Sequence, residues 1–554
     1  MRRFPGFFLL LFLAGGITFA SAPLAFAQNE EEPRHGGRLI MGSLGEPINL
    51  ISMLTSDAAS HQASNYFYIA PLRYNKDLEI EPWAAESYEV LEEGKLLRFK
   101  LREDILWEDG TPFTAHDVEF TYRLIIDPKT PTAYAGDYRM ISEFTRTGEY
   151  TFEVRYNQPF SRSLITWMHN VLPKHLLQDE NLLDTPLARK PVSVGTYRFK
   201  EWAYGSHMVM ESNPGYFLGQ PYIDELVYRF IPDLSTIFLE LRARRLDMGS
   251  LTPLQYLRQT NGPEWDEYWQ KYRYLASGYT FLGYNLEHPF FKDVRVRQAL
   301  SHAIDCRELI KGVLFGQGEI TVGPYKPGTW VYNDKLTPYA HDPKKSLELL
   351  AEAGIMDRDG DGVLDVPVER SDGSIAWQPF AFTLLVNQGN EDREKLAVII
   401  QAQLKPLGIN VHIRSVEWAA FINDFINKRR FETLLLSWNT LEDPDLSDVW
   451  HSSRADNGGL NFMGFRNAEA DEMLERGAAS FDRNERKPLY DRLQEILHEE
   501  QPYTFLYVPY ALPIVQARIR GIVPAAAGIQ HNYEQWWDSS VPAERPAIRA
   551  GVLP

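Results

Sequence analysis

The 554-residue sequence contains a single cysteine, Cys306. One cysteine cannot form an intramolecular disulfide, which excludes a disulfide framework. Cys306 lies in a helical run, so we expect it to pack as a small buried hydrophobic group. Since no other cysteine is present, none near the N-terminus could carry a lipid.

The sequence also lacks an excess of basic residues. It has 75 acidic against 57 basic side chains, a formal net charge of −18. Such a charge repels phosphate backbones and anionic lipid, so we expect no nucleic-acid partner. The composition is that of a folded soluble protein, and the length predicts two to four domains or lobes.

Apolar runs long enough to span a bilayer are missing after the N-terminal segment. That segment has the pattern of a signal peptide, 1–27, with Arg2 and Arg3, an apolar stretch from Phe7 to Leu13, and Ala25-Phe26-Ala27 as the cleavage site. The alternative is a membrane anchor, which the short run, broken by two glycines, disfavours. An exported chain without a lipid or an anchor predicts the periplasm.

Motifs of common catalytic sites are absent too. The sequence has no G-x-S-x-G, H-E-x-x-H, P-loop or C-x-x-C pattern, so we expect no enzyme. His498-Glu499-Glu500 ends an apolar-periodic helix and is interpreted as a solvated terminus rather than a metal site. A secreted hydrolase with scattered catalytic residues, or a chaperone, remains the alternative class.

The patterns that are present indicate an α/β protein. Apolar residues alternate at 97–101 and 150–156, which predicts two half-buried strands, and 117–126 predicts a helix between them. Asp293 and Asn390 are placed to cap later helices, and Gly408 to end the second one. Strands are expected near 409–413 and 434–436, so helices alternate with strands of a covered sheet.

Five collinear segments carry a family resemblance. The first is WEDGTPFTAHDV (107–118), which predicts a turn at Asp109-Gly110, a rigid Pro112 and a helix capped near Thr114, with Trp107 as a core plug. The others lie at 213–233, 284–305, 416–425 and 434–450. Together they resemble the family 5 extracellular solute-binding proteins, which include dipeptide, oligopeptide and nickel binders.

The resemblance implies a periplasmic binding protein type II fold of cluster C: two lobes joined by a hinge, with an extra subdomain on lobe I. By resemblance, lobe I comprises 28–72, 192–282 and 502–554, the extra subdomain 73–191, and lobe II 283–501. It implies a monomer that captures a peptide or other small solute between the lobes and delivers it to ABC transporter permease subunits at the inner membrane. Closure over the ligand would present a changed surface to the transporter.

The resemblance also implies a ligand site. Trp418 and Trp438 would form its walls, and the backbone from Leu436 to Asn439 would face the cleft. Asp57 and Ala58 lie on the matching segment of lobe I, and Tyr134 matches a position of the extra subdomain that closes over the ligand. The competing interpretation of both tryptophans is that they are core residues.

Departures from the family leave the ligand open. The positions of the acidic and basic anchors of peptide binders hold Leu441 and Leu435. Glu442 or Asp443 could shift to pair with a ligand ammonium, with Asp445 nearby; alternatively all three form a solvated acidic turn. An oligosaccharide or a metal chelate is therefore an alternative to a peptide.

One acidic cluster has the spacing of a calcium loop. Asp357, Asp359 and Asp361 precede Gly362 as in an EF-hand, but the twelfth position is Val368 instead of the bidentate glutamate. The pattern is half complete, so calcium binding competes with an ordinary Asp-Gly turn. No other cofactor is expected.

Overall fold

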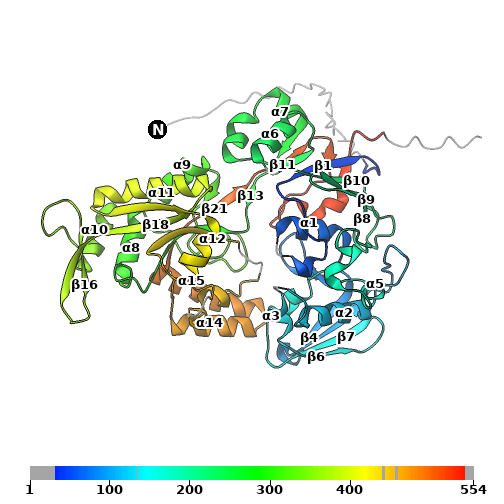
Figure 1. Ribbon diagram of the computed structural model, residues 1–554, viewed down its shortest axis with the longest axis horizontal. Helices are drawn as coiled ribbons and strands as arrows, with labels where there is room; N and C mark the ends of the chain where they lie inside the picture. The colour runs from blue at the N-terminus through cyan, green and yellow to red at the C-terminus, as the bar shows by residue number, and fades with distance from the viewer. Residues whose placement is uncertain are drawn as a thin grey trace, which may run out of the picture.

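The computed structural model describes residues 32–542 except 56, 133, 232, 440–442 and 456–458. The expected signal peptide, 1–27, lies outside these residues. Within them, no helix combines the length and the apolar character needed to cross a membrane. The chain forms three parts built on separate sheets, two on the right and one on the left of Figure 1.

The first part, called lobe I below, is built on a seven-stranded mixed sheet. Its strand order is β12-β22-β11-β1-β10-β9-β8, with β1 parallel to β10 and to β11. The strands are β1 (Arg38–Ser43), β8 (Tyr197–Ala203), β9 (His207–Ser212), β10 (Glu225–Phe230), β11 (Met248–Ser250), β12 (Trp269–Lys271) and β22 (Pro513–Gln516). The accompanying helices are α1 (Ala58–Phe67), α6 (Leu234–Arg242) and α7 (Pro263–Tyr268).

The second part, lobe II, has its own sheet in the order β13-β21-β14-β20-β18-β19, with β15 paired to β21. Its strands are β13 (Tyr274–Leu275), β14 (Tyr279–Tyr284), β15 (Gly318–Glu319), β18 (Ala381–Asn387), β19 (Asn410–Val416), β20 (Thr433–Trp438) and β21 (Tyr503–Ala511). The two-stranded hairpin β16 (Asp365–Glu369) and β17 (Ile375–Pro379) extends from it at the left of Figure 1.

The helices of lobe II cover this sheet. They are α8 (Val294–Ala303), α9 (Cys306–Leu314), α10 (Pro343–Glu352), α11 (Glu391–Leu404), α12 (Trp418–Ala420), α13 (Ser447–Trp450), α14 (Ala468–Ala479) and α15 (Arg483–Glu500). The predicted caps are confirmed, because Asp293 accepts from the Arg295 backbone and Asn390 from that of Arg393. Gly408 has the left-handed φ of 76° that a chain reversal after the helix requires.

The third part, the extra subdomain, is a four-stranded antiparallel sheet in the order β4-β5-β7-β6. Its strands are β4 (Ala85–Leu91), β5 (Leu96–Leu101), β6 (Ile141–Arg146) and β7 (Thr151–Tyr156), and its helices are α2 (Ala115–Ile126), α3 (Ala135–Tyr138), α4 (Ser163–Thr166) and α5 (Lys174–Leu177). Its core is continuous with that of lobe I. As predicted, Trp107 is buried in it, 2% exposed.

Two crossings join the lobes. The chain passes from the first sheet to the second between Lys271 and Tyr274, and returns between Ala511 and Pro513. Strand β13 pairs with β21 at this point, near the centre of Figure 1. The expected boundaries at 282/283 and 501/502 differ from these crossings, because β14 and β21 belong to the second sheet.

The start of α2 provides a test of local stability. Thr114 accepts from the His116 backbone and Asp117 from the Thr114 backbone, which is a capping box. Thr114→Ala removes the hydroxyl that accepts the His116 N–H. We therefore expect the free energy of unfolding to fall by about 1 kcal/mol. Urea unfolding followed by tryptophan fluorescence measures it. Thr114→Ser keeps the hydroxyl and serves as the control; equal losses in both variants would contradict the role of the cap.

Candidate functional site

Two cavities lie next to each other where the parts meet. The first, about 830 Å³, is lined by α1, the segments 134–138 and 165–170, and residues 530–534. The second, about 850 Å³, is lined by the extra subdomain on one side and by residues 445–454 and 475–479 of lobe II on the other. Asp137 and Arg162 line both cavities, so the space in lobe I continues toward lobe II. We call them the lobe I cavity and the interlobe cavity.

The structure brings two of the expected residues together in lobe I. The Tyr134 hydroxyl donates to the Thr55 carbonyl at 3.0 Å and lies 2.8 Å from Nε2 of His61. Oδ1 of Asp57 accepts the backbone N–H of Ser60 and so caps α1. Its second carboxylate oxygen, Oδ2, is buried without a hydrogen-bond partner among the described residues. Burial raises the pKa of Tyr134, and the charge of Asp57 adds to the rise. Tyr134 lines the lobe I cavity, and Ala58 is the first residue of α1.

Trp418 and Trp438 lie at one edge of the second sheet. Strands β19 and β20 both run parallel to the neighbouring β18, and each tryptophan sits at or just beyond the carboxyl end of its strand. In open sheets with parallel strands this edge is where ligands bind. The two expected wall residues are therefore on the same edge, although neither lines the two cavities above.

The two indole rings differ in their surroundings. Trp418 is 49% exposed, and its ring stacks on Phe421 with centroids 5.9 Å apart. Trp438 is half-buried, donates from Nε1 to the Tyr503 hydroxyl at 3.2 Å and packs on Phe462. Trp418 thus presents a free aromatic surface, whereas Trp438 is held in place by its neighbours.

Part of β20 has an open edge. β14 pairs with it along its whole length, but β18 pairs only at Thr433 and Leu434. From residue 435 onward no other described strand pairs on that side, and Asn439 follows the strand exposed to solvent. The backbone groups on this edge can accept an added strand, which is one way in which proteins bind extended peptides.

The two described acids of the turn after β20, Asp443 and Asp445, are buried rather than solvated. Asp443 and Arg486 have side chains only 7% and 8% exposed, and they form a salt bridge with an N–O distance of 2.9 Å. Asp445 is also buried; it accepts from the Ser447 backbone and lines the interlobe cavity. Burial raises the pKa of Asp445. Glu442 and Leu441 lie outside the described residues.

The same turn is tied to the extra subdomain. Arg486 donates to the hydroxyl of Ser161 at 3.1 Å, and the backbone N–H of Ser161 donates to the Ala478 carbonyl. Beside it, Arg162 bridges Asp137 of the subdomain and Asp448 of lobe II at 2.9 and 3.1 Å. Sequence analysis missed both arginines, because neither belongs to a motif and their partners are distant in the chain.

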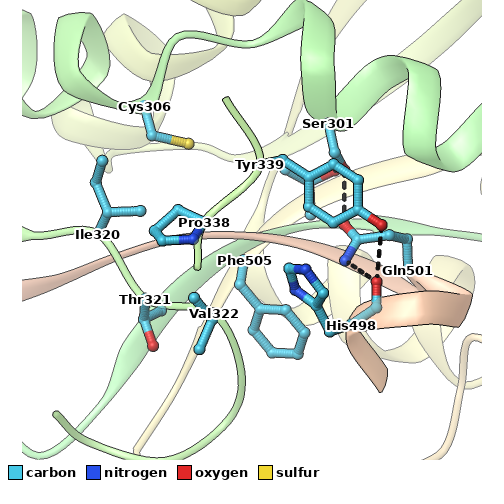
Figure 2. A pocket seen from close by; sticks show the side chains of 11 residues that line it. Ser301, Cys306, Ile320, Thr321, Val322, Pro338, Tyr339, His498, Gln501 and Phe505 are labelled. Atoms are coloured by element: carbon cyan, nitrogen blue, oxygen red, sulfur yellow. Dashed lines mark hydrogen bonds between the residues drawn. The ribbon is translucent and has the colours of Figure 1, made fainter. Parts of the chain in front are cut away.

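A much smaller cavity lies inside lobe II (Figure 2). Its volume of about 20 Å³ suffices for roughly one water molecule. The Cys306 sulfur and the rings of Tyr339, His498 and Phe505 line it. Burial raises the pKa of the Cys306 thiol to about 12, so the thiolate that would bind a metal is disfavoured.

The candidate calcium loop lies far from these cavities, ahead of β16. Asp357, Asp359 and Asp361 are exposed, and each places a carboxylate oxygen within 4.8 Å of the others. Their oxygens accept backbone N–H groups of Gly360, Asp361 and Val363. The geometry suits an Asp-Gly turn as well as a cation, so calcium stays a prediction.

Comparisons with known proteins identify the fold and the family. The model of the bacterial extracellular solute-binding proteins, family 5 Middle, matches residues 79–459. The oligopeptide-binding protein AppA of Bacillus subtilis is 31% identical over 96% of both chains. Its structure in complex with a nonapeptide superposes with a TM-score of 0.74 over 92% of this chain and 100% of that one.

A second solved structure has the same fold. The periplasmic binding protein DppA of Helicobacter pylori, in complex with the peptide STSA, is 25% identical, with a TM-score of 0.72 over 91% of this chain and 99% of that one. The expected two-lobed α/β fold is confirmed by these likenesses and by the two sheets with their subdomain. The chain belongs to the family 5 bacterial extracellular solute-binding proteins.

Proposed function

We propose that this chain is the ligand-binding subunit of an ABC importer, which captures an extended peptide between its lobes and delivers it unaltered to permease subunits at the inner membrane. The observation that carries the proposal is the open edge of β20 beside two tryptophans at the carboxyl end of the sheet. Of the relatives named above, AppA is an oligopeptide-binding protein whose structure holds a nonapeptide, and the structure of DppA holds the peptide STSA. Secretion through the segment 1–27, release into the periplasm and a monomeric state complete the proposal.

The carboxylate that would pair with a peptide ammonium is the unusual feature of this site. Asp443 already has Arg486 as its partner, and a second cation would have to compete with a buried guanidinium. Leu441 and Leu435 are apolar. We therefore propose that the ligand is held through its backbone and side chains, with Glu442 as the remaining acidic candidate for its amino terminus.

The first test identifies the ligand. We expect mass spectrometry of protein purified under native conditions to find copurified peptides, and small-angle scattering to show contraction when such a peptide is added. Peptides recovered at unchanged mass exclude hydrolysis. An oligosaccharide or a metal chelate as the copurified molecule, or cleavage of added peptide, would contradict the proposal.

The exposed tryptophan gives the second test. Since Trp418 is 49% exposed and stacks on Phe421 of the core, Trp418→Ala should lower the free energy of unfolding by about 1 kcal/mol. Loss of its ring from the ligand should weaken peptide binding about 10-fold, as measured by isothermal titration calorimetry. Trp418→Phe keeps a ring and should recover most of the affinity. Unchanged affinity of Trp418→Ala would remove this residue from the site.

The ligand's amino terminus gives the third test. We expect an N-acetylated peptide to bind Glu442→Gln and wild type equally well, while the free-amine peptide binds Glu442→Gln more weakly than wild type.

Asp443→Asn should instead lower the free energy of unfolding by about 3 kcal/mol, because it leaves Arg486 buried without its counter-charge. A loss of free-amine binding in Asp443→Asn at normal stability would assign the ammonium to Asp443.

A further inference from the structure

The lobe I cavity contains a carboxylate that the site described so far does not use. Glu534 belongs to the short helical segment Gln530–Gln535 and lines this cavity together with Arg73, Trp83, Tyr216 and Tyr533. Its side chain makes no salt bridge or side-chain hydrogen bond with any residue in the part of the chain that the structure describes. Glu534 is half-buried, and burial raises its pKa, while the nearby charges of Arg73 and His531 offset part of the rise.

The cations of the cavity are already paired. Arg73 donates from Nε to Glu81 at 2.7 Å and lies over the ring of Trp83. Arg162 is shared between Asp137 and Asp448. His531 is hydrogen-bonded through Nε2 to the Val523 carbonyl. Among the described residues, Glu534 is therefore the carboxylate lining this cavity that forms no salt bridge, although Arg73 and His531 lie near enough for their charges to act on it.

Three aromatic rings line the same cavity as this carboxylate. Trp83 donates from Nε1 to the Tyr216 hydroxyl at 3.0 Å, and the Tyr533 hydroxyl is 2.7 Å from that of Thr196, so all three rings are fixed. Burial raises the pKa of Tyr216 to about 12, and the nearby charge of Glu534 contributes. A cavity lined by fixed aromatic rings and a carboxylate is a favourable environment for an organic cation, which gains both the charge pair and cation–π attraction.

We infer that the lobe I cavity is a subsite for a cationic group of the ligand, the ammonium or guanidinium of a basic side chain, with Glu534 as its counter-charge and Trp83, Tyr216 and Tyr533 as its walls. The inference rests on the proposed function, because it assigns the cavity to a side chain of the captured peptide. It adds a preference that the open edge of β20 does not supply, since backbone pairing is indifferent to side-chain charge.

The placement of the cavity fits this role. It continues through Asp137 and Arg162 into the interlobe cavity, so a ligand that lies between the lobes can direct a side chain into it. A volume of about 830 Å³ has room for a lysine or arginine side chain with water around it. Nε2 of His169, which has no hydrogen-bond partner among the described residues, lines the same cavity and offers a further polar contact.

Matched peptides test the inference. Three peptides of equal length carry lysine, norleucine or glutamate at the same position. Further sets of three place this substitution at each other position of the peptide, and all affinities are measured by isothermal titration calorimetry. We expect wild type to bind the best lysine peptide about 10-fold more tightly than its norleucine counterpart. Glu534→Gln should remove this preference and leave the norleucine peptide unchanged. Glu369→Gln, at an exposed position of β16, is the control and should behave as wild type.

The outcomes separate the two proposals. Tight binding of all peptides with no lysine preference in wild type, or a preference that persists in Glu534→Gln, would overturn the subsite alone. If no peptide binds, the proposed function fails, and N-acetyl-lysine methylamide against its norleucine counterpart tests the cavity by itself. Binding of the lysine probe to wild type and not to Glu534→Gln supports the subsite in that case, and equal behaviour of the two probes excludes it.

Discussion

The buried salt bridge between Arg486 and Asp443 is the interaction on which the site depends. A buried ion pair is costly to desolvate, and it persists only where additional hydrogen bonds satisfy both groups. Here Asp443 also accepts the Asp445 backbone N–H, and Arg486 donates to the hydroxyls of Tyr490 and Ser161, although its Nε is buried without a partner among the described residues. These contacts fix the far end of the loop that begins after Trp438. The salt bridge thus anchors the end of the segment that we propose to face the ligand.

Further contacts between the extra subdomain and lobe II lie beside this pair. The turn between α14 and α15 rests on the extra subdomain, where the ring of Phe481 lies so close to Gly94 that a Cβ there would be 2.3 Å from it. Arg483 and Glu79 form a further salt bridge across the same contact. The subdomain is therefore joined to lobe I by a shared core and to lobe II by charged contacts. If the lobes close about the crossings at 271–274 and 511–513, the contacts between the subdomain and lobe II either stay intact, with the subdomain moving together with lobe II, or break.

Local signals in the sequence predicted the elements well. The strands β5 and β7, the helix α2 with its cap and the caps of α8 and α11 all depend on neighbours within a few residues, which the sequence displays directly. The positions of the crossings could not be predicted in this way. β21 belongs to the second sheet because it pairs with β14, more than two hundred residues earlier in the chain, and no local pattern encodes that pairing.

In the candidate site, too, some residues could be predicted from the sequence and others only from the folded chain. Resemblance placed Trp418 and Trp438, and the parallel strands show why both reach one edge. It could not foresee that Asp443 is occupied, because the partner Arg486 lies on a helix 43 residues further along and is visible only once α15 packs beside the turn. Nor could it identify Glu534, whose significance arises from its place in the lobe I cavity without a salt bridge among the described residues. A charge acquires a role from what surrounds it, so the electrostatics of a cleft formed by distant segments have to be read from the folded chain, whereas caps and strands can be read from the sequence.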